Sequence, residues 1–325
     1  MTARAASRPT AERGTGPPVV AVIGPTATGK SGAAIGLARR LIAAGRPAEI
    51  VNADSMQLYV GLDVGTAKVP PDQRGAVPHH LLDVWSISRS AAVAEYQRLA
   101  RECIDRLRRA DTIAVLVGGS GLYVRAALDQ LDFPGESPPI RARLQRELDT
   151  VGSPAMHARL AGTDPAAAAA ILPGNGRRIV RALEVIELTG GPFRARMPPF
   201  ASVYPAVQIG LDRDDLDARI DQRVEAMMAA GLLREVRGLL PLGLRASPTA
   251  GKALGYAQLL AVLDDEGRLV GPLEDAVAAT QRGTRRFVRR QRSWFRRDPR
   301  VRWLAATDPE LVSTMLTLVP PTLGE

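Results

Sequence analysis

Cysteine, histidine and long apolar runs are scarce in this 325-residue sequence, and each scarcity excludes a class of protein. A single cysteine, Cys103, cannot form an internal disulfide, so a reducing compartment is expected. The three histidines and that thiol lack the spacing of a zinc site. No apolar run approaches the ~20 residues of a membrane span, and residues 1–17 lack the apolar core of a signal peptide. We expect a soluble, cytoplasmic protein with a disordered basic tail over 1–17.

Basic residues are plentiful and unevenly placed. Lys and Arg number 43 against 34 Asp and Glu, which gives a net charge of +9. Residues 281–303 alone contain ten arginines and one acid, Asp298, so the rest of the chain is close to neutral. A charge confined to one segment indicates an anionic partner for that segment.

A glycine-rich loop follows the apolar run at 19–23 and precedes a helix expected over 32–41. It matches the P-loop pattern G-x-x-x-x-G-K-[ST] with Gly24, Pro25, Thr26, Ala27, Thr28, Gly29, Lys30 and Ser31. Its backbone N–H groups can cradle phosphate groups at a helix N-terminus. Lys30 is expected to reach the terminal phosphates, and the Ser31 hydroxyl to hold Mg²⁺. A plain glycine turn is the alternative.

Apolar strands alternate with helices from residue 19 to about 129. Strands are expected over 49–54 and 112–117, and a helix over 91–109. This alternation predicts an α/β fold with a doubly wound parallel sheet of the P-loop NTPase-like type. Ligands of such sheets bind beyond the carboxyl ends of the strands, which brings the P-loop, Asp54 and the loop at 118–121 to one rim.

The alternation stops near Phe133. Helices are expected over 140–150, 164–172 and 177–188, bounded by Pro and Gly clusters. A strand is expected over 207–211, and helices over the remainder. We therefore divide the chain into a first part of the core (18–130), a helical insertion domain (131–200), a second part of the core (201–310) and a C-terminal tail (311–325).

Residues 281–297 have two faces on a helical wheel. One carries Phe287, Val288, Gln291, Trp294 and Phe295 and is expected to pack on the core. The opposite face carries a row of arginines: Arg282, Arg285, Arg289, Arg292 and Arg296. Guanidinium groups bind phosphates bidentately, so this row fits a nucleic-acid backbone. A solvated surface helix and an anionic membrane surface are the alternatives.

The acid that a hydrolytic P-loop enzyme carries at the end of a later strand is absent, because the strand at 112–117 ends in Gly-Gly-Ser-Gly. Asp54 stands at the tip of the second strand instead. That position resembles the acid of P-loop kinases that meets the acceptor, and it favours group transfer over a motor or a switch. A strand-end cap or an outer-shell partner of Mg²⁺ is the alternative role.

Further motifs follow the P-loop in a fixed order, at residues 53–59, 61–68, 77–83, 118–123, 177–184, 254–256 and 289–296. Together with residues 24–31, this series resembles the bacterial tRNA dimethylallyltransferase (tRNA isopentenyltransferase) family. A lone P-loop is generic, whereas the ordered series is specific. Ser31 and Ser120 stand where many members have threonine, and each keeps the hydroxyl.

Members of that family transfer a dimethylallyl group from dimethylallyl diphosphate to the exocyclic amine of an adenosine immediately 3′ of the anticodon, in tRNAs that read codons beginning with U. The resemblance implies that the P-loop, Lys30 and Mg²⁺ on Ser31 stabilise the departing diphosphate. It implies that Asp54 orients the amine and accepts its proton. The adenosine has to leave its stack to reach such a site.

The resemblance also implies which residues contact tRNA. They are Asp54, Ser55, Met56, Gln57, Ser120, Arg177, Arg178, Arg181, Arg289, Arg290, Arg292 and Arg296. Thr66 and Lys68 are implied to line the active-site channel, and the insertion to grip the anticodon stem-loop. Arg178 and Arg181 lie at helix spacing from Glu184 and Glu187, so internal ion pairs are the alternative.

Other functions stay open at this point. One alternative is a P-loop kinase that acts on a small acceptor and consumes ATP. A close variant of the transferase would prenylate free adenine nucleotides instead of tRNA. Neither enzyme needs ten arginines in one segment. An RNA-binding protein with a relict phosphate loop is the non-enzymatic alternative, which the joint presence of Lys30, Ser31 and Asp54 disfavours. We expect a monomeric prenyltransferase that uses Mg²⁺.

Overall fold

The computed structural model describes residues 16–195 and 197–321. Contacts divide the chain into two compact units. The core comprises the chain up to Asp129 and from Ser202 onward, and the insertion comprises Gln130–Ala201, one residue beyond each end of the segment at 131–200. The tail expected over 1–17 lies, apart from its last two residues, outside the described part.

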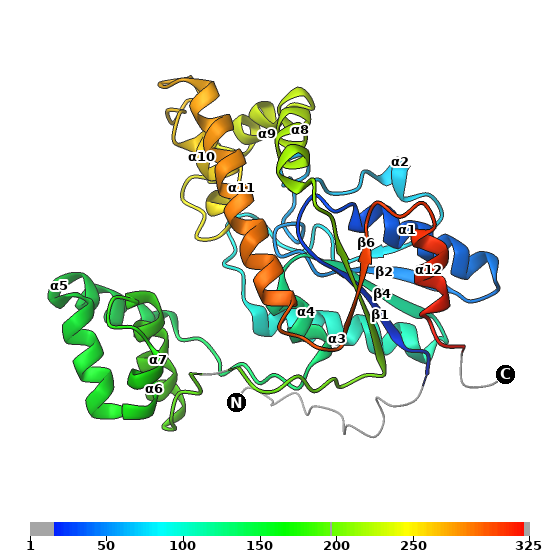
Figure 1. The fold of residues 1–325 in the computed structure, drawn as a ribbon. Helices are drawn as coiled ribbons and strands as arrows, with labels where there is room; N and C mark the ends of the chain where they lie inside the picture. Colours follow the sequence, from blue (N-terminus) through cyan, green and yellow to red (C-terminus); the bar gives the residue numbers. More distant parts are fainter. Residues whose placement is uncertain (1–15, 196, 322–325) are drawn as a thin grey trace. The chain divides into compact units, whose positions relative to one another are not determined.

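Six parallel strands form the sheet of the core, in the order β3-β2-β4-β1-β5-β6 (Figure 1). They are β1 (Val19–Ile23), β2 (Ala48–Asn52), β3 (His79–His80), β4 (Ile113–Gly118), β5 (Ala206–Asp212) and β6 (Val301–Ala305). The central strands β1 and β4 are buried along their whole length, as an interior parallel sheet requires. The predicted parallel α/β fold is confirmed.

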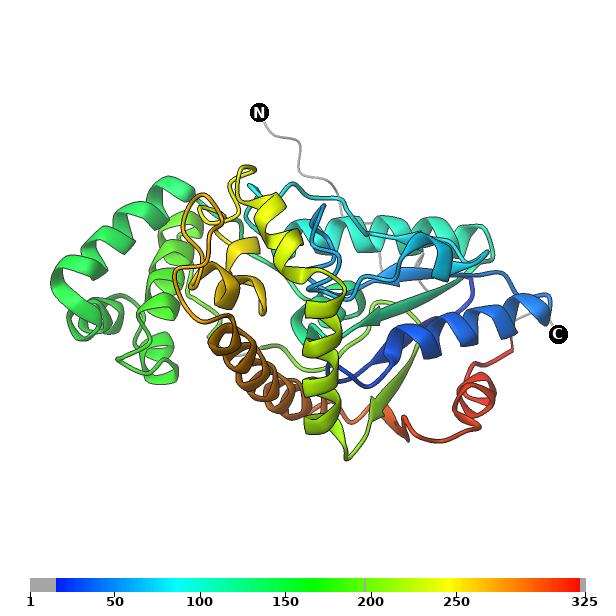
Figure 2. The same ribbon diagram turned by 90° about the horizontal axis from the view of Figure 1, so that it is seen from above.

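Helices cover both faces of this sheet (Figures 1 and 2). On one face, α1 (Lys30–Ala43) and α12 (Leu311–Thr317) share an apolar cluster with the strands, to which Leu37, Leu41 and Met315 contribute fully buried side chains. On the other face lie α3 (Val93–Arg109) and α4 (Gly121–Leu128). The sheet is therefore doubly wound, and its carboxyl ends stay open for a ligand.

Shorter helices and one long helix complete the core. They are α2 (Pro71–Arg74), α8 (Leu216–Ala229), α9 (Leu232–Leu239), a 3₁₀ turn (Ala250–Lys252), α10 (Tyr256–Leu260) and α11 (Leu273–Phe295). Two acids in the first turn of α11, Glu274 and Asp275, favour its N-terminus. Val288, Gln291 and Phe295 are buried, so the predicted packing face of this helix is confirmed.

The insertion has an apolar centre of its own. It contains α5 (Pro138–Thr163), α6 (Pro165–Ala170) and α7 (Gly176–Thr189), packed around a cluster that includes Leu144, Leu160 and Ile179. The α5 segment consists of two helical pieces that meet at the non-helical Gly152 (φ 79°), so the first piece ends close to its expected end at 150 and the second was not predicted. Oδ1 of Asp164 caps α6 by accepting a hydrogen bond from the Ala167 N–H at 2.9 Å.

Two expectations about the chain's C-terminal part are wrong. Helices do not fill the remainder of the core, because Val301–Ala305 forms the edge strand β6 beside β5. The described part of the segment expected as a tail is not a tail either, because Leu311 and Met315 of α12 and the following Val319 join the apolar cluster over the sheet. No helix in the described part combines the length and apolarity that crossing a membrane demands.

Candidate active site at the carboxyl ends of the strands

The P-loop turns sharply out of β1 and into α1. A Cβ on Gly24 (φ 137°) would lie 2.3 Å from the Leu211 carbonyl oxygen, so only glycine fits there. Gly29 (φ 88°) forms the left-handed N-cap of α1. Lys30 begins that helix, and its Nζ donates a hydrogen bond to the Pro25 carbonyl at 2.5 Å across the loop. The loop is thus folded around its own lysine.

The charge state of Lys30 depends on its surroundings. Burial lowers the pKa of Lys30 to about 7; the Asp54 carboxylate acts in the opposite direction, and the Arg223 guanidinium adds to the lowering. The ammonium therefore loses its proton near neutral pH unless an anion stabilises it. A bound diphosphate would supply that anion.

The turn after β2 holds Asp54. The Asp54 N–H donates to Oδ1 of Asn52 at 2.9 Å, and Oδ1 of Asp54 accepts from the Met56 N–H at 2.9 Å. Asn52 also donates to the carbonyls of Asp54 and Leu81. One carboxylate oxygen thus fixes the turn, and Asp54 has part of the cap role considered above. Because only Oδ1 bonds to the turn, Oδ2 of this fixed carboxylate is left to contact a substrate.

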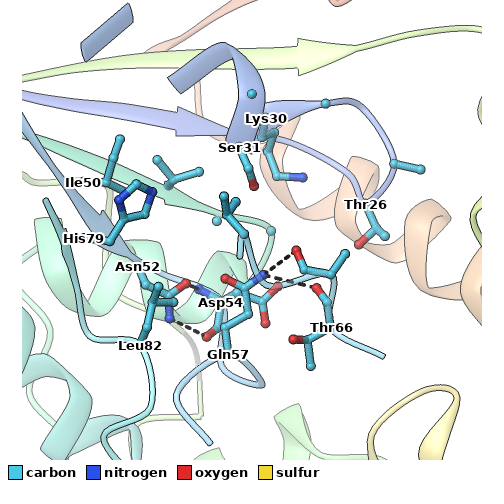
Figure 3. A pocket seen from close by; sticks show the side chains of 18 of the residues that line it. Thr26, Lys30, Ser31, Ile50, Asn52, Asp54, Gln57, Thr66, His79 and Leu82 are labelled. Atoms are coloured by element: carbon cyan, nitrogen blue, oxygen red, sulfur yellow. Dashed lines mark hydrogen bonds between the residues drawn. The ribbon is translucent and has the colours of Figure 1, made fainter. Parts of the chain in front are cut away.

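The P-loop, Asp54 and the end of β4 line one cavity (Figure 3). Its polar side chains include Lys30, Ser31, Asp54 and Arg223, and its larger apolar side chains are Ile50, Val69, Leu82 and Val117. Gln57 and Thr66 close one side, where Nε2 of Gln57 donates to the Thr66 carbonyl at 3.1 Å. We call this cavity the donor cavity, because it joins phosphate-binding groups to an apolar lining.

A second cavity adjoins the donor cavity within the core. The two share four lining residues, Thr26, Asp54, Thr66 and Arg223. The second cavity, which we call the acceptor cavity, is also lined by Ser55, Met56, Ser120, Met227, Leu254, Phe287 and Arg290. Oγ of Ser120 accepts a hydrogen bond from the Ser55 N–H at 3.3 Å, which links the turn after β2 to the end of β4.

Two arginines of α8 belong to this site although the sequence analysis did not select them. Arg223 lines both cavities, and its guanidinium donates to the Thr66 carbonyl at 3.5 Å. Arg219, one turn earlier, donates from Nε to the Ala27 carbonyl of the P-loop at 3.1 Å. The available signal was weak: two arginines four residues apart, on a helix just after an internal strand.

Lys68 lies beside the donor cavity and is held by acids of its own. Its ammonium is buried and bonded to the Tyr59 carbonyl and to the carboxylates of Asp63 and Asp83. It lines neither the donor nor the acceptor cavity. Lys68 lines two other cavities, which share Ala67 and Val69 with the donor cavity, so its place along the channel stays a prediction. Thr66 does line both the donor and the acceptor cavity.

The arginines of α11 and of the two residues that follow it, Arg296 and Arg297, divide into two groups. Arg285 pairs with Asp221 of α8, and Arg292 and Arg296 pair with Asp212 at the end of β5. The expected row of unpaired guanidinium groups is therefore wrong for these three. Exposed arginines that pair with no acid among the described residues are Arg282, Arg286, Arg289, Arg290 and Arg297.

The arginines predicted in the insertion also differ from one another. Arg181 pairs with Glu184 at 2.9 Å, the alternative that helix spacing offered. Arg178 donates to the Ala195 carbonyl. Arg177 is exposed on α7. Of the three, Arg177 has the side chain most available to an external phosphate.

Comparisons with known proteins agree with the motif series. A family model described as IPP transferase matches residues 57–298. The chain belongs to the IPP transferase family. The resemblance inferred from the motifs is confirmed, and this membership disfavours a small-acceptor kinase and a relict RNA-binding protein.

Individual relatives of this IPP transferase family member extend over nearly the whole chain. A tRNA dimethylallyltransferase of Thermobifida fusca (strain YX) is 60% identical and covers 93% of this chain and 94% of its own length. One from Streptomyces coelicolor is 58% identical and covers 93% and 96%. A solved structure, the full-length tRNA isopentenylpyrophosphate transferase of Bacillus halodurans, is 36% identical with a TM-score of 0.65 and covers 93% of this chain and 94% of that one.

Proposed function

We propose that this protein transfers a dimethylallyl group from dimethylallyl diphosphate to the exocyclic amine of an adenosine in tRNA and releases diphosphate. The relatives' names support the reaction. The observation that carries the proposal for this chain is the junction of two cavities at Asp54. One cavity suits a diphosphate with a short apolar chain, and the other suits a planar base.

The donor cavity has the groups that a departing diphosphate needs. The P-loop N–H groups, Lys30 and Arg223 place positive charge where negative charge develops when the allylic C–O bond breaks. The residues also fit Mg²⁺: the Ser31 hydroxyl lines the cavity, and Mg²⁺ commonly takes its other ligands from substrate phosphates and water. When bound, Mg²⁺ would supply further charge stabilisation for the diphosphate.

The acceptor cavity fits the other half of the reaction. Met56, Met227, Leu254 and Phe287 offer apolar surface to an extruded base. Bond formation joins the amine nitrogen to the allylic carbon, the C–O bond breaks with its electron pair leaving on diphosphate, and the amine loses one proton. Asp54 lies at the junction with a fixed carboxylate, so it is the group that accepts that proton.

Recognition of the tRNA is assigned to exposed charge. Four of the unpaired arginines lie on α11, the helix that borders the acceptor cavity through Phe287 and Arg290; they are Arg282, Arg286, Arg289 and Arg290. Arg177 on α7 gives the insertion a phosphate contact of its own, which supports its assignment to the anticodon stem-loop. We further propose the adenosine 3′ of the anticodon as the target, in tRNAs that read U-initial codons, and a monomer acting in the cytoplasm.

The deciding experiment combines purified protein, Mg²⁺, radiolabelled dimethylallyl diphosphate and unmodified tRNA, with and without ATP. We expect label in acid-precipitable RNA that does not require ATP. Nuclease digestion then locates the labelled nucleoside. ATP hydrolysis or phosphorylation of a small acceptor, with no labelled RNA, would contradict the proposal and favour a kinase.

The matched variant is Asp54→Asn. Asparagine keeps an acceptor for the Met56 N–H and so preserves the turn, but it cannot take up the amine proton. We expect transfer to fall by about 10²–10⁴-fold while tRNA and pyrophosphate still bind. Full activity of this variant would show that the proton goes elsewhere.

A further inference from the structure

A buried amide on α11 connects two loops of the active site. Gln291 is 5% exposed. Its Oε1 accepts a hydrogen bond from the Thr26 N–H at 2.9 Å, and its Nε2 donates one to the Gly119 carbonyl at 2.9 Å. The P-loop and the loop after β4 are therefore tied to one side chain, which comes from a helix distant in sequence from both.

The helix and these loops fit closely. A Cβ on Gly119 would lie 2.5 Å from Nε2 of Gln291, and a Cβ on Gly121 would lie 2.0 Å from the ring of Trp294. Gln291 and Trp294 are three residues apart on α11, so they lie on the same side of the helix. Because packed groups move together, a shift of α11 would displace the P-loop as well.

The same stretch of α11 offers charge to an external polyanion. Arg289 and Arg290 directly precede Gln291 and are exposed, and Arg290 borders the acceptor cavity. An RNA phosphate held by these guanidinium groups would act on the helix turn that fixes Thr26. The RNA-facing side and the P-loop side of α11 are thus two sides of one turn.

We propose that Gln291 is a positioning residue that couples RNA binding on α11 to the shape of the P-loop. Its amide presents an acceptor and a donor at once, which no apolar or ionised side chain of that length does. The inference rests on the proposed function, since it needs RNA on α11 and diphosphate in the P-loop. By linkage, each ligand changes the affinity for the other by the same factor.

The test measures the dissociation constant of pyrophosphate with Mg²⁺ by calorimetry, with and without a saturating unmodified anticodon stem-loop RNA. For the unaltered protein we expect the RNA to change this constant by roughly fivefold or more. Gln291→Met keeps the side-chain length and removes both hydrogen bonds. We expect its coupling factor to fall to about one and its affinity for RNA alone to stay within about twofold.

Gln281→Met is the matched control, because Gln281 lies ten residues earlier on the same helix and is only partly buried. We expect it to keep the full coupling factor. If Gln291→Met does not fold, Gln291→Glu replaces it: this variant keeps the acceptor for Thr26 and loses the donor for Gly119, so coupling should again be lost.

Two outcomes would overturn the inference. One is an equal pyrophosphate affinity with and without RNA in the unaltered protein, and the other is an unchanged coupling factor in the folded Gln291 variant. Failure of the proposed function looks different, because the unaltered protein then binds no stem-loop RNA and transfers no label to it. In that case the coupling proposal would be wrong as well.

Discussion

At the scale of single residues, the site depends on two charged side chains that are fixed by hydrogen bonds to nearby backbone groups. Lys30 is buried in the loop that it closes, and Asp54 holds a turn with one oxygen. The sequence identified both, because a P-loop lysine and a strand-end acid have recognisable contexts. Arg223 was missed because only the fold brings α8 to the P-loop, and an arginine on an ordinary helix has no local signal.

The lowered pKa of Lys30 predicts proton uptake when pyrophosphate binds. Above pH 7 the free protein has a largely neutral Lys30, and a bound anion restores the charge by raising this pKa. Affinity should therefore fall as the pH rises above 7, by up to about tenfold per unit. Titration calorimetry at pH 8 in two buffers of different ionisation enthalpy measures the uptake.

Lys30→Arg is the control for that experiment, because a guanidinium stays protonated throughout. Pyrophosphate titrates in this range too, and the difference between the two proteins removes its contribution. Equal proton uptake by both proteins would contradict a neutral Lys30 in the free protein.

At the scale of elements, α11 shows what a helical wheel can and cannot predict. The wheel gave the packing face correctly, since Val288, Gln291 and Phe295 are buried. It could not tell paired arginines from unpaired ones, because the acids that hold Arg285 and Arg292 come from α8 and from the end of β5. The arginine-rich composition of the segment predicted a basic helix, but it did not predict which arginines are left unpaired.

This division predicts different consequences for two neighbouring arginines. Arg292→Gln leaves Asp212, whose side chain is only 18% exposed, with a weaker partner, so unfolding free energy should drop by about 1–3 kcal/mol. Arg289→Gln, at an exposed position, should leave stability within about 0.5 kcal/mol. It should weaken RNA binding and reduce the salt slope by about one.

Chemical denaturation and RNA titrations over a salt series test both arginine variants together. A stable Arg292→Gln protein, or an Arg289→Gln protein with the original salt slope, would contradict the assignment of pairing to the first and of phosphate contact to the second.

At the scale of the whole molecule, the sequence predicted the sheet interior better than its edges. Strands β1 and β4 are continuous apolar runs, which are visible in any sequence. The edge strand β3 has two residues, and β6 follows an arginine-rich helix, so neither has a period to detect. The α12 helix is short, and only its packing on the sheet reveals its place in the core.

The insertion leaves and rejoins the core at adjacent points. Asp129 and Ser202 form an antiparallel bridge, the Val203 N–H donates to the Leu128 carbonyl at 2.7 Å, and Arg300 bonds to the Asp129 carboxylate and the Ser202 hydroxyl. The buried Asp129 carboxylate also accepts from Arg125. All these contacts lie within the core unit, so the chain ends at the junction stay together without the insertion.

Replacing residues 130–201 by a short Gly-Ser linker should therefore leave a folded core. We expect cooperative unfolding and a pyrophosphate dissociation constant within about threefold of the full-length value, since the donor cavity lies entirely in the core. Stem-loop RNA should bind about tenfold or more weakly, a loss of roughly 1.4 kcal/mol or more. Arg177→Gln in the full-length protein should show a fraction of that loss.

Two results would contradict these expectations. A shortened protein that aggregates or no longer binds pyrophosphate would mean that the core needs the insertion to fold. An unchanged RNA affinity would mean that the insertion does not take part in tRNA recognition.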